Sequence, residues 1–450
     1  MKSSSIATVL ALVPGIVCLL AVGGAGAVTT DGLLEPLGLE GLTVTSLSLY
    51  GGVLAAGTNG DGVYWQVDQY LPDSTWVHIG LDGLNVRAVY AHKSGPVGWA
   101  IGAGVDPPIG DSVFAYCSYM GQEFVPSSDG ISDELTYGVF ELDGFPDPSI
   151  CGETYAAAGR AVYRREFSAT IWVPVYIGTI ECYIGTVVAH EDVAGVVLAG
   201  GAEGFAGFLL IKSVDFGDSW QDISPLLAYV HDVDFLGESA EVIFVASSRG
   251  VLRSMDGGDN WDEVLEPPAP DYHFVTEVAI DPTRPRIWAA SGRHDEVSFL
   301  FYSDDLGETW QPLALTMFGA VTDLEVDHSG TLYFSHQSEG VFRLDATLVD
   351  VEDGTPPQPP AILYQNFPNP FNPGTTIPFL LRSAAPVVLT VVDLSGRRVS
   401  ELLHETLGRG LHVTQWDGRN SRGQDVPSGV YFYRLQAGSY QVTSRMTLVR

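Results

Sequence analysis

The sequence predicts an all-β protein, and three of its features carry that prediction. The 450 residues include 51 Gly and 27 Pro, which tight turns use most. They also include 19 Tyr and 20 Phe, which strands favour. Short motifs recur along the chain at nearly even spacing, as in proteins built from many copies of one small β unit.

The clearest repeat is an eight-residue pattern, Ser-x-Asp-x-Gly-x-x-Trp, that occurs three times. Its Asp can accept backbone N–H groups in a turn, its Gly can take a positive φ, and its Trp can begin the next strand and pack between repeats. The pattern resembles the Asp-box (BNR) repeat of sialidases, xyloglucanases, sortilin-like receptors and photosystem assembly factors. That resemblance implies a structural role away from the ligand face. The twelve positions are Ser213, Asp215, Gly217, Trp220, Ser254, Asp256, Gly258, Trp261, Ser303, Asp305, Gly307 and Trp310.

Degenerate copies extend the repeat towards the N-terminus. Aromatic residues stand at positions 76, 124, 172, 220, 261 and 310, separated by 41 to 49 residues. This period fits a four-stranded propeller blade. Seven short first strands are predicted, at 44–47, 86–89, 136–139, 184–187, 230–233, 275–278 and 321–324. The sequence therefore predicts a seven-bladed β-propeller followed by a small immunoglobulin-like β-sandwich. Residues 33–42 resemble 75–84, so an N-terminal strand is expected to complete the last blade.

Four segments are predicted along the chain. Residues 1–27 read as a signal peptide, with Lys2, an apolar run over 6–22 and a small-residue cleavage site at 25–27. A retained membrane anchor is the alternative; no membrane span is expected once the signal is removed. Residues 28–350 form the propeller, 351–361 a Pro-rich linker and 362–450 the C-terminal domain.

The C-terminal domain carries specific motifs at 364–373 and 416–435. It resembles the C-terminal sorting domain of type IX secretion, which is related to the immunoglobulin-like domain of a flagellar hook-capping protein. The resemblance implies that the type IX secretion machinery is a partner. It also implies a secreted protein, or one attached to the outer-membrane cell surface of a Gram-negative bacterium. An ordinary small β-sandwich is the alternative.

The charge is acidic and unevenly spread. The net charge is −33, yet residues 361–450 hold 9 Arg against 5 acids. A body this acidic repels nucleic acid and anionic lipid, so neither is expected as a partner. No cofactor is evident and no metal-binding motif is found, although a bound cation such as calcium stays open. A glycan or a protein is the expected ligand.

Candidate site residues follow from aligning the seven first strands. One equivalent position holds Ser46, Ala88, Gly138, Thr186, Asp232, Glu277 and Asp323. Asp232, Glu277 and Asp323 would lie on adjacent blades at the channel mouth, where paired carboxylates could catalyse glycoside hydrolysis. The favoured interpretation is that they cap neighbouring backbone. Candidate ligand contacts nearby are Arg87, Tyr137, His231, Arg293 and His294.

Three functions stay open on this evidence. A non-enzymatic binding module is favoured over a glycoside hydrolase or lyase, and a stability or assembly factor is the third. A sialidase fits poorly, because arginines that could hold a substrate carboxylate are scarce in the propeller. Cys117 and Cys151 are the candidate disulfide pair, which would leave Cys182 as a free thiol.

Overall fold

A computed structural model describes the chain outside residues 1–27, 30–33, 68–74, 95–97, 107–114, 120–122, 133–138, 145–152, 167–168, 191–192, 205–206, 225–228, 238–239, 267–273, 292–296, 345–359, 364–365, 367–368, 382–383, 409 and 439. The predicted signal peptide and most of the predicted linker thus lie outside the described residues. Every named element is a β-strand, as the sequence predicts. Within the described part of the chain, no helix is long and apolar enough to cross a membrane.

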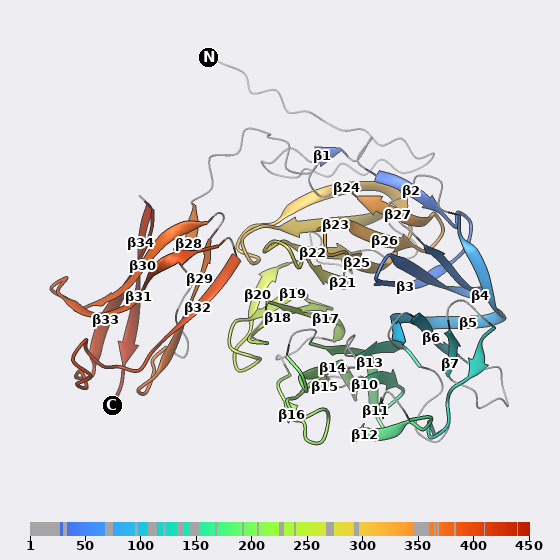
Figure 1. Ribbon diagram of the computed structural model, residues 1–450, viewed down its shortest axis with the longest axis horizontal. Coiled ribbons are helices and arrows are strands. Elements are labelled where there is room, and N and C mark those ends of the chain that lie inside the picture. The colour runs from blue at the N-terminus through green and yellow to red at the C-terminus, as the bar shows by residue number, and fades with distance from the viewer. Residues whose placement is uncertain are drawn as a thin grey trace, which may run out of the picture.

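The strands from Val28 to Leu344 form six sheets (Figure 1). A six-stranded sheet holds β3 (Val44–Tyr50), β4 (Val53–Val67), β5 (Val77–Ser94), β6 (Gly98–Asp106), β7 (Ala115–Tyr119) and β8 (Val125–Pro126). Each of the next three sheets has four strands. The first holds β9 (Glu141–Gly144), β10 (Glu153–Ala158), β11 (Ala161–Glu166) and β12 (Val173–Ile177), and the second holds β13 (Cys182–Ala189), β14 (Val197–Glu203), β15 (Gly207–Ser213) and β16 (Gln221–Asp222). The third holds β17 (Val230–Leu236), β18 (Val242–Ser247), β19 (Gly250–Ser254) and β20 (Asp262–Leu265).

The last two sheets of the propeller recruit strands from the N-terminal end of the chain. One holds β21 (Val275–Ile280), β22 (Ile287–Ser291), β23 (Val297–Ser303), β24 (Gln311–Phe318) and, parallel to β24, β1 (Val28–Thr29). The other holds β25 (Val321–Val326), β26 (Leu332–His336), β27 (Gly340–Leu344) and β2 (Leu34–Gly38). Antiparallel pairing of β2 with β27 confirms the predicted closing strand. The parallel addition of β1 was not predicted.

The innermost strands follow one another around a ring. In chain order they are β3, β5, β9, β13, β17, β21 and β25; each contacts the next, and β25 contacts β3. β5 is both the outer strand of one repeat and the inner strand of the next, which is why six sheets accommodate this ring. A ring closed in this way packs each inner edge strand against the next one. The seven-blade count stays a prediction, and this order of contacts supports it.

The three repeated turns share one hydrogen-bond pattern. In the third copy, Ser303 Oγ accepts the Gly307 N–H at 2.8 Å, and Asp305 Oδ1 accepts the Thr309 N–H at 2.8 Å. The first and second copies repeat both bonds with their own residues. The turn also needs glycine: Gly258 has φ 107°, and a Cβ there would lie 2.6 Å from Ile223 Cδ1. Local turn chemistry therefore explains the repeat.

Tryptophans at the predicted aromatic positions join adjacent repeats. The indole N–H of Trp220 donates to the Val175 carbonyl at 3.1 Å, and that of Trp261 donates to the Ile223 carbonyl at 3.0 Å. Trp76 and Trp172 make equivalent bonds to Leu37 and Ser127. Each apolar cluster likewise draws on neighbouring sheets, such as the one shared by β17–β19 and β21–β23. The core thus lies between the sheets.

The C-terminal domain packs two sheets face to face. One holds β28 (Ala361–Leu363), β29 (Thr375–Leu381) and β32 (Gly410–Trp416); the other holds β30 (Ala385–Val392), β31 (Arg398–Leu407), β33 (Gly429–Ala437) and β34 (Tyr440–Leu448). Phe371, Trp416, Tyr433 and Met446 are buried between them. This is a small β-sandwich, as predicted; β28 begins at Ala361, the last residue assigned to the linker.

Candidate functional site at the inner ring

The three carboxyl groups singled out from the sequence lie on adjacent inner strands. Asp232 is on β17, Glu277 on β21 and Asp323 on β25. Each follows an irregularity in strand pairing, between Val230 and Asp232 on β17 and at the equivalent places on β21 and β25. A β-bulge re-aims the side chains beside it. The charges of Asp232 and Asp323 both act on Glu277, so the structure brings the three groups together.

A fourth carboxyl, on Glu141, belongs to the same position. Glu141 pairs with Ala157, as Asp232 pairs with Ala246 in the equivalent hairpin. The sequence alignment that placed Gly138 here was wrong by three residues. The signal was present in the sequence, because Val-x-acid-Val/Leu begins at Val139 as it does at the other acidic strands. We call Glu141, Asp232, Glu277 and Asp323 the ring carboxyls.

The two aspartates of this set are bonded to the backbone of the next inner strand. Asp232 Oδ2 accepts the Val278 N–H at 3.0 Å, and its Oδ1 accepts the Val233 N–H at 2.7 Å. Asp323 Oδ2 accepts the Leu47 N–H at 2.7 Å, across the point where the ring closes. These carboxylates satisfy N–H groups that no β-ladder reaches. Both aspartates therefore connect one sheet to the next, as the favoured interpretation expected.

A second layer of side chains, two residues further along the strands, also accepts backbone N–H groups from the next inner strand. Asp143 accepts the Ala189 N–H at 2.7 Å and Asp234 accepts the Ile280 N–H at 3.0 Å. On β3, the hydroxyl oxygen of Ser48 accepts the Ala91 N–H at 3.0 Å. Short polar side chains at alternate inner-strand positions thus join neighbouring sheets in two layers.

Protein surrounds the ring carboxyls, although each remains partly exposed to water. Desolvation raises the pKa of Asp232 to about 6, against the backbone bonds that lower it. Desolvation, and then the charge of Asp232, raises the pKa of Asp323 to about 7. The same causes raise the pKa of Glu277 and of Glu141 well above the usual range for glutamate. The ring therefore resists carrying four negative charges at once.

The two glutamates differ from the aspartates in their contacts. Among the described residues, neither Glu141 nor Glu277 is seen to make a side-chain hydrogen bond. Within the described part of the chain, Glu141 and Glu277 are thus the two ring carboxyls without a hydrogen bond, and any acid–base chemistry would fall to them.

The predicted ligand contacts are only partly described. Arg87 forms an ion pair with Asp106 at 2.6 Å and lies over the ring of Phe140, so its charge is already matched. His231 is exposed and its ring lies near that of Phe274. Tyr137, Arg293 and His294 fall outside the described residues.

The cysteine and metal predictions are also only partly covered. Cys182 is a buried free thiol on β13. The Cys117–Cys151 pairing cannot be placed, because Cys151 and the side chain of Cys117 lie outside what is described. Among the described residues, no three His, Cys, Asp or Glu side chains converge as a metal ion requires. The ring carboxyls thus lie near enough to repel one another without forming a set of metal ligands.

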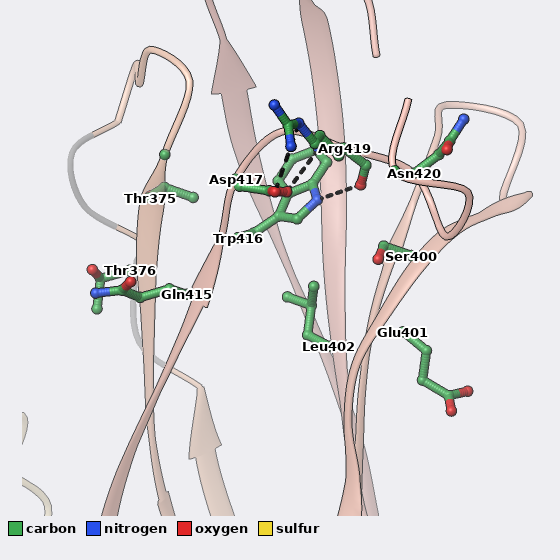
Figure 2. A pocket seen from close by; sticks show the side chains of 12 residues that line it. Thr375, Thr376, Ser400, Glu401, Leu402, Gln415, Trp416, Asp417, Arg419 and Asn420 are labelled. Atoms are coloured by element: carbon green, nitrogen blue, oxygen red, sulfur yellow. Dashed lines mark hydrogen bonds and ion pairs between the residues drawn. The ribbon is translucent and has the colours of Figure 1, made fainter. Parts of the chain in front are cut away.

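A separate cavity of about 670 Å³ opens in the C-terminal domain, between β32 and β31 (Figure 2). Thr376 and Gln415 lie on one side, and Ser400 and Leu402 on the other. The Trp416 indole N–H donates to the Arg419 carbonyl at 2.8 Å at its end. Its lining is mixed and carries no cluster of catalytic side chains.

Comparisons with known proteins agree with this architecture. Residues 372–443 match the family described as the FlgD Ig-like domain. Among solved structures, the GH74 xyloglucanase from Xanthomonas campestris is similar with a TM-score of 0.55 and 14% identity, over 90% of this chain and 80% of that one. YCF48 bound to D1 peptide has a TM-score of 0.51 and 14% identity, over 69% of this chain and 94% of that one. The WD40 propeller domain of Doa1 has a TM-score of 0.50 and 12% identity, over 69% of this chain and 95% of that one.

These likenesses define the class of protein through its fold. The chain is an all-β protein that combines a β-propeller with a C-terminal Ig-like domain. No curated protein matches it in sequence.

Proposed function

We propose that this chain is an exported β-propeller that binds a glycan or protein ligand without catalysing a reaction. The observation that carries the proposal is the state of the candidate catalytic acids. Asp232 and Asp323 accept backbone N–H groups from the next inner strand. A carboxylate engaged in this way holds the scaffold together and is poorly placed to act on a substrate.

Export is proposed from the two ends of the chain. The N-terminal sequence resembles a signal peptide, and the C-terminal domain resembles the type IX sorting domain. The match of 372–443 to an Ig-like family supports the relationship that this resemblance implies. On this proposal the type IX machinery recognises the C-terminal domain, and the propeller reaches the cell surface or the medium of a Gram-negative bacterium. The Asp-box repeats serve only as turns of the scaffold.

A glycoside hydrolase is the second candidate function, and one observation favours it. Glu141 and Glu277 are not engaged by backbone N–H groups among the described residues, and they have raised pKa values. An inverting or retaining glycosidase needs one protonated and one ionised carboxyl. The xyloglucanase likeness agrees with this alternative through fold only, since fold does not define function. The assembly-factor alternative rests on the YCF48 likeness in the same limited way.

One experiment separates binding from catalysis. The mature protein, its Glu277→Gln and Glu141→Gln variants, and an exposed control, Glu40→Gln, are assayed on a glycan and polysaccharide panel for binding and for released sugar. We expect binding to at least one glycan of the panel, and no released sugar from the wild type or any variant. Cleavage by the wild type and by Glu40→Gln that is lost in Glu277→Gln or Glu141→Gln would overturn the non-enzymatic proposal.

The export proposal has its own test. The full chain and a version ending at Asp350 are expressed in a bacterium with a type IX system. We expect the full chain at the cell surface or in the medium and the shortened chain in the periplasm. Equal export of both would show that the C-terminal domain is no sorting signal.

A further inference from the structure

The described residues of the inner strands include many acids and few bases. β9 contributes Glu141 and Asp143, β17 contributes Asp232 and Asp234, β21 contributes Glu277, and β25 contributes Asp323 and Glu325. At the equivalent positions of the other three inner strands, the only titratable side chain is that of Tyr90. These positions hold Ser46 and Ser48 on β3, Ala88 and Tyr90 on β5, and Thr186 and Val188 on β13.

The basic groups nearest in sequence do not offset these charges. Arg87 on β5 is paired with Asp106, and His231 on β17 is exposed. His92 on β5 stacks on the ring of Tyr90, and burial lowers its pKa to about 4, so it is neutral at physiological pH. Among the described residues, no lysine or arginine is named as a charge that acts on the ring carboxyls. Protons are therefore the available means of relieving repulsion among these carboxyls.

The bonding pattern indicates where such protons reside. Asp232 and Asp323 accept N–H groups, and Thr186 also hydrogen-bonds to Asp232, interactions that favour the ionised carboxylate. Glu141 and Glu277 have no such bonds among the described residues. A protonated glutamic acid is neutral and can donate a hydrogen bond, whereas an ionised one adds a further negative charge. The glutamates are the natural first holders of the protons. The aspartates take up protons only at lower pH, where their carboxyl oxygens can still accept the N–H groups that join the sheets.

We infer that the ring carboxyls form a proton-sharing device that closes the propeller more firmly at mildly acidic pH than at neutral or alkaline pH. Three observations carry this inference. The four carboxyls share one position on the inner strands, three of them on adjacent strands; the two aspartates make inter-sheet bonds; and the two glutamates have no hydrogen bond among the described residues. It is independent of whether the propeller binds a glycan or a protein, and it holds even if the binding proposal fails.

The sign follows from linkage between protonation and folding. Each ring carboxyl has a folded-state pKa above its unfolded value, which is 3.8 for aspartate and 4.5 for glutamate. Folding therefore takes up protons, so the contribution to stability is fully present below pH about 4 and is lost as pH rises through the folded values. For Asp232 and Asp323 those values are about 6 and about 7. The sensitive window of the aspartates thus runs from about pH 4 to 7, and the raised pKa values of the glutamates act in the same direction.

The test is thermal unfolding of the full chain between pH 5 and 8.5. Wild type is compared with Glu277→Gln and Glu141→Gln, which keep size and remove the titration, and with Glu40→Gln, which removes one exposed charge. We expect the wild-type Tm to fall as pH rises, each ring variant to show a flatter dependence and a higher Tm at pH 8, and Glu40→Gln to keep the wild-type slope. Ring variants that keep the wild-type slope would overturn the inference.

A second measurement guards against variants that fold poorly. Proton release on unfolding is measured at pH 6 in weakly buffered solution, where wild type should release more protons than Glu277→Gln. Equal release from both proteins would also overturn the inference. A ligand assay at one pH is unaffected by either result, so failure here is distinguishable from failure of the proposed function.

Discussion

Replacing Asp304 tests how far a buried cation governs the stability of this propeller. Arg286 is 1% exposed, and its guanidinium donates to both carboxylate oxygens of Asp304, at 2.7 and 2.8 Å. It also lies over the rings of Trp288 and Tyr302, with its Cζ 5.5 and 4.7 Å from their centroids. Asp304→Ala would leave a charge inside the protein without its carboxylate partner.

The expected cost is about 3 kcal/mol. Breaking a buried ion pair on one side costs about 3–5 kcal/mol, and the lower end applies because the Asp304 side chain is 28% exposed, so water can reach the vacated site. The double variant Arg286→Met with Asp304→Ala removes the charge as well, so it should fall within about 1 kcal/mol of wild type. The aromatic rings can pack against methionine.

Urea unfolding of the full chain, followed by tryptophan fluorescence, measures these free energies for both single variants and the double variant. The resulting double-mutant cycle isolates the coupling between the two residues. A cost below about 1 kcal/mol for Asp304→Ala would place the pair with exposed ion pairs and refute the reasoning. So would a double variant as unstable as the single one.

Three further predictions concern the turns, the tryptophans and the free thiol. Gly258→Ala should destabilise the protein by about 1–3 kcal/mol, because φ is 107° and the new Cβ would lie 2.6 Å from Ile223. The control Gly237→Ala, with φ 79° and no atom within 4 Å of the new Cβ, should cost less. Equal urea midpoints for the two variants would exclude the contact with Ile223 as a cause. Trp261→Phe loses the hydrogen bond to the Ile223 carbonyl, so its unfolding free energy should fall by about 1 kcal/mol more than that of Trp310→Phe. The indole N–H of Trp310 has no partner among the described residues. Denaturation curves that shift equally in the two variants would contradict this. Burial raises the pKa of Cys182 to about 11, so a thiol reagent at pH 7.5 should label Cys182 slowly in the native protein and rapidly in urea. Mass spectrometry of the peptide that contains Cys182 measures both rates. Rapid labelling of the native protein would show that the thiol is accessible.

Much of the architecture could be predicted because its signals are local. The Ser, Asp and Gly of each repeated turn bond within four residues of one another, so the pattern is legible in any short window. The closing strand was predicted because 33–42 repeats the pattern of an outer strand, and β2 does pair with β27. The third inner strand was misaligned because Thr136 to Val139 resembles a strand start as well as Val139 to Leu142 does. Only pairing of Glu141 with Ala157 distinguishes the two registers.

By itself, then, the sequence determined an all-β fold, the turns of its repeats and the presence of acids at one inner-strand position. Tertiary structure decided what those acids do. Asp232 meets an N–H 46 residues away and Asp323 meets one 276 residues away, distances that no local pattern encodes. It also separated the aspartates, whose carboxylates join two sheets, from Glu141 and Glu277, for which no hydrogen bond is seen among the described residues. The physical reason is that the N–H groups of an inner strand are fixed in space only once its neighbour is in place.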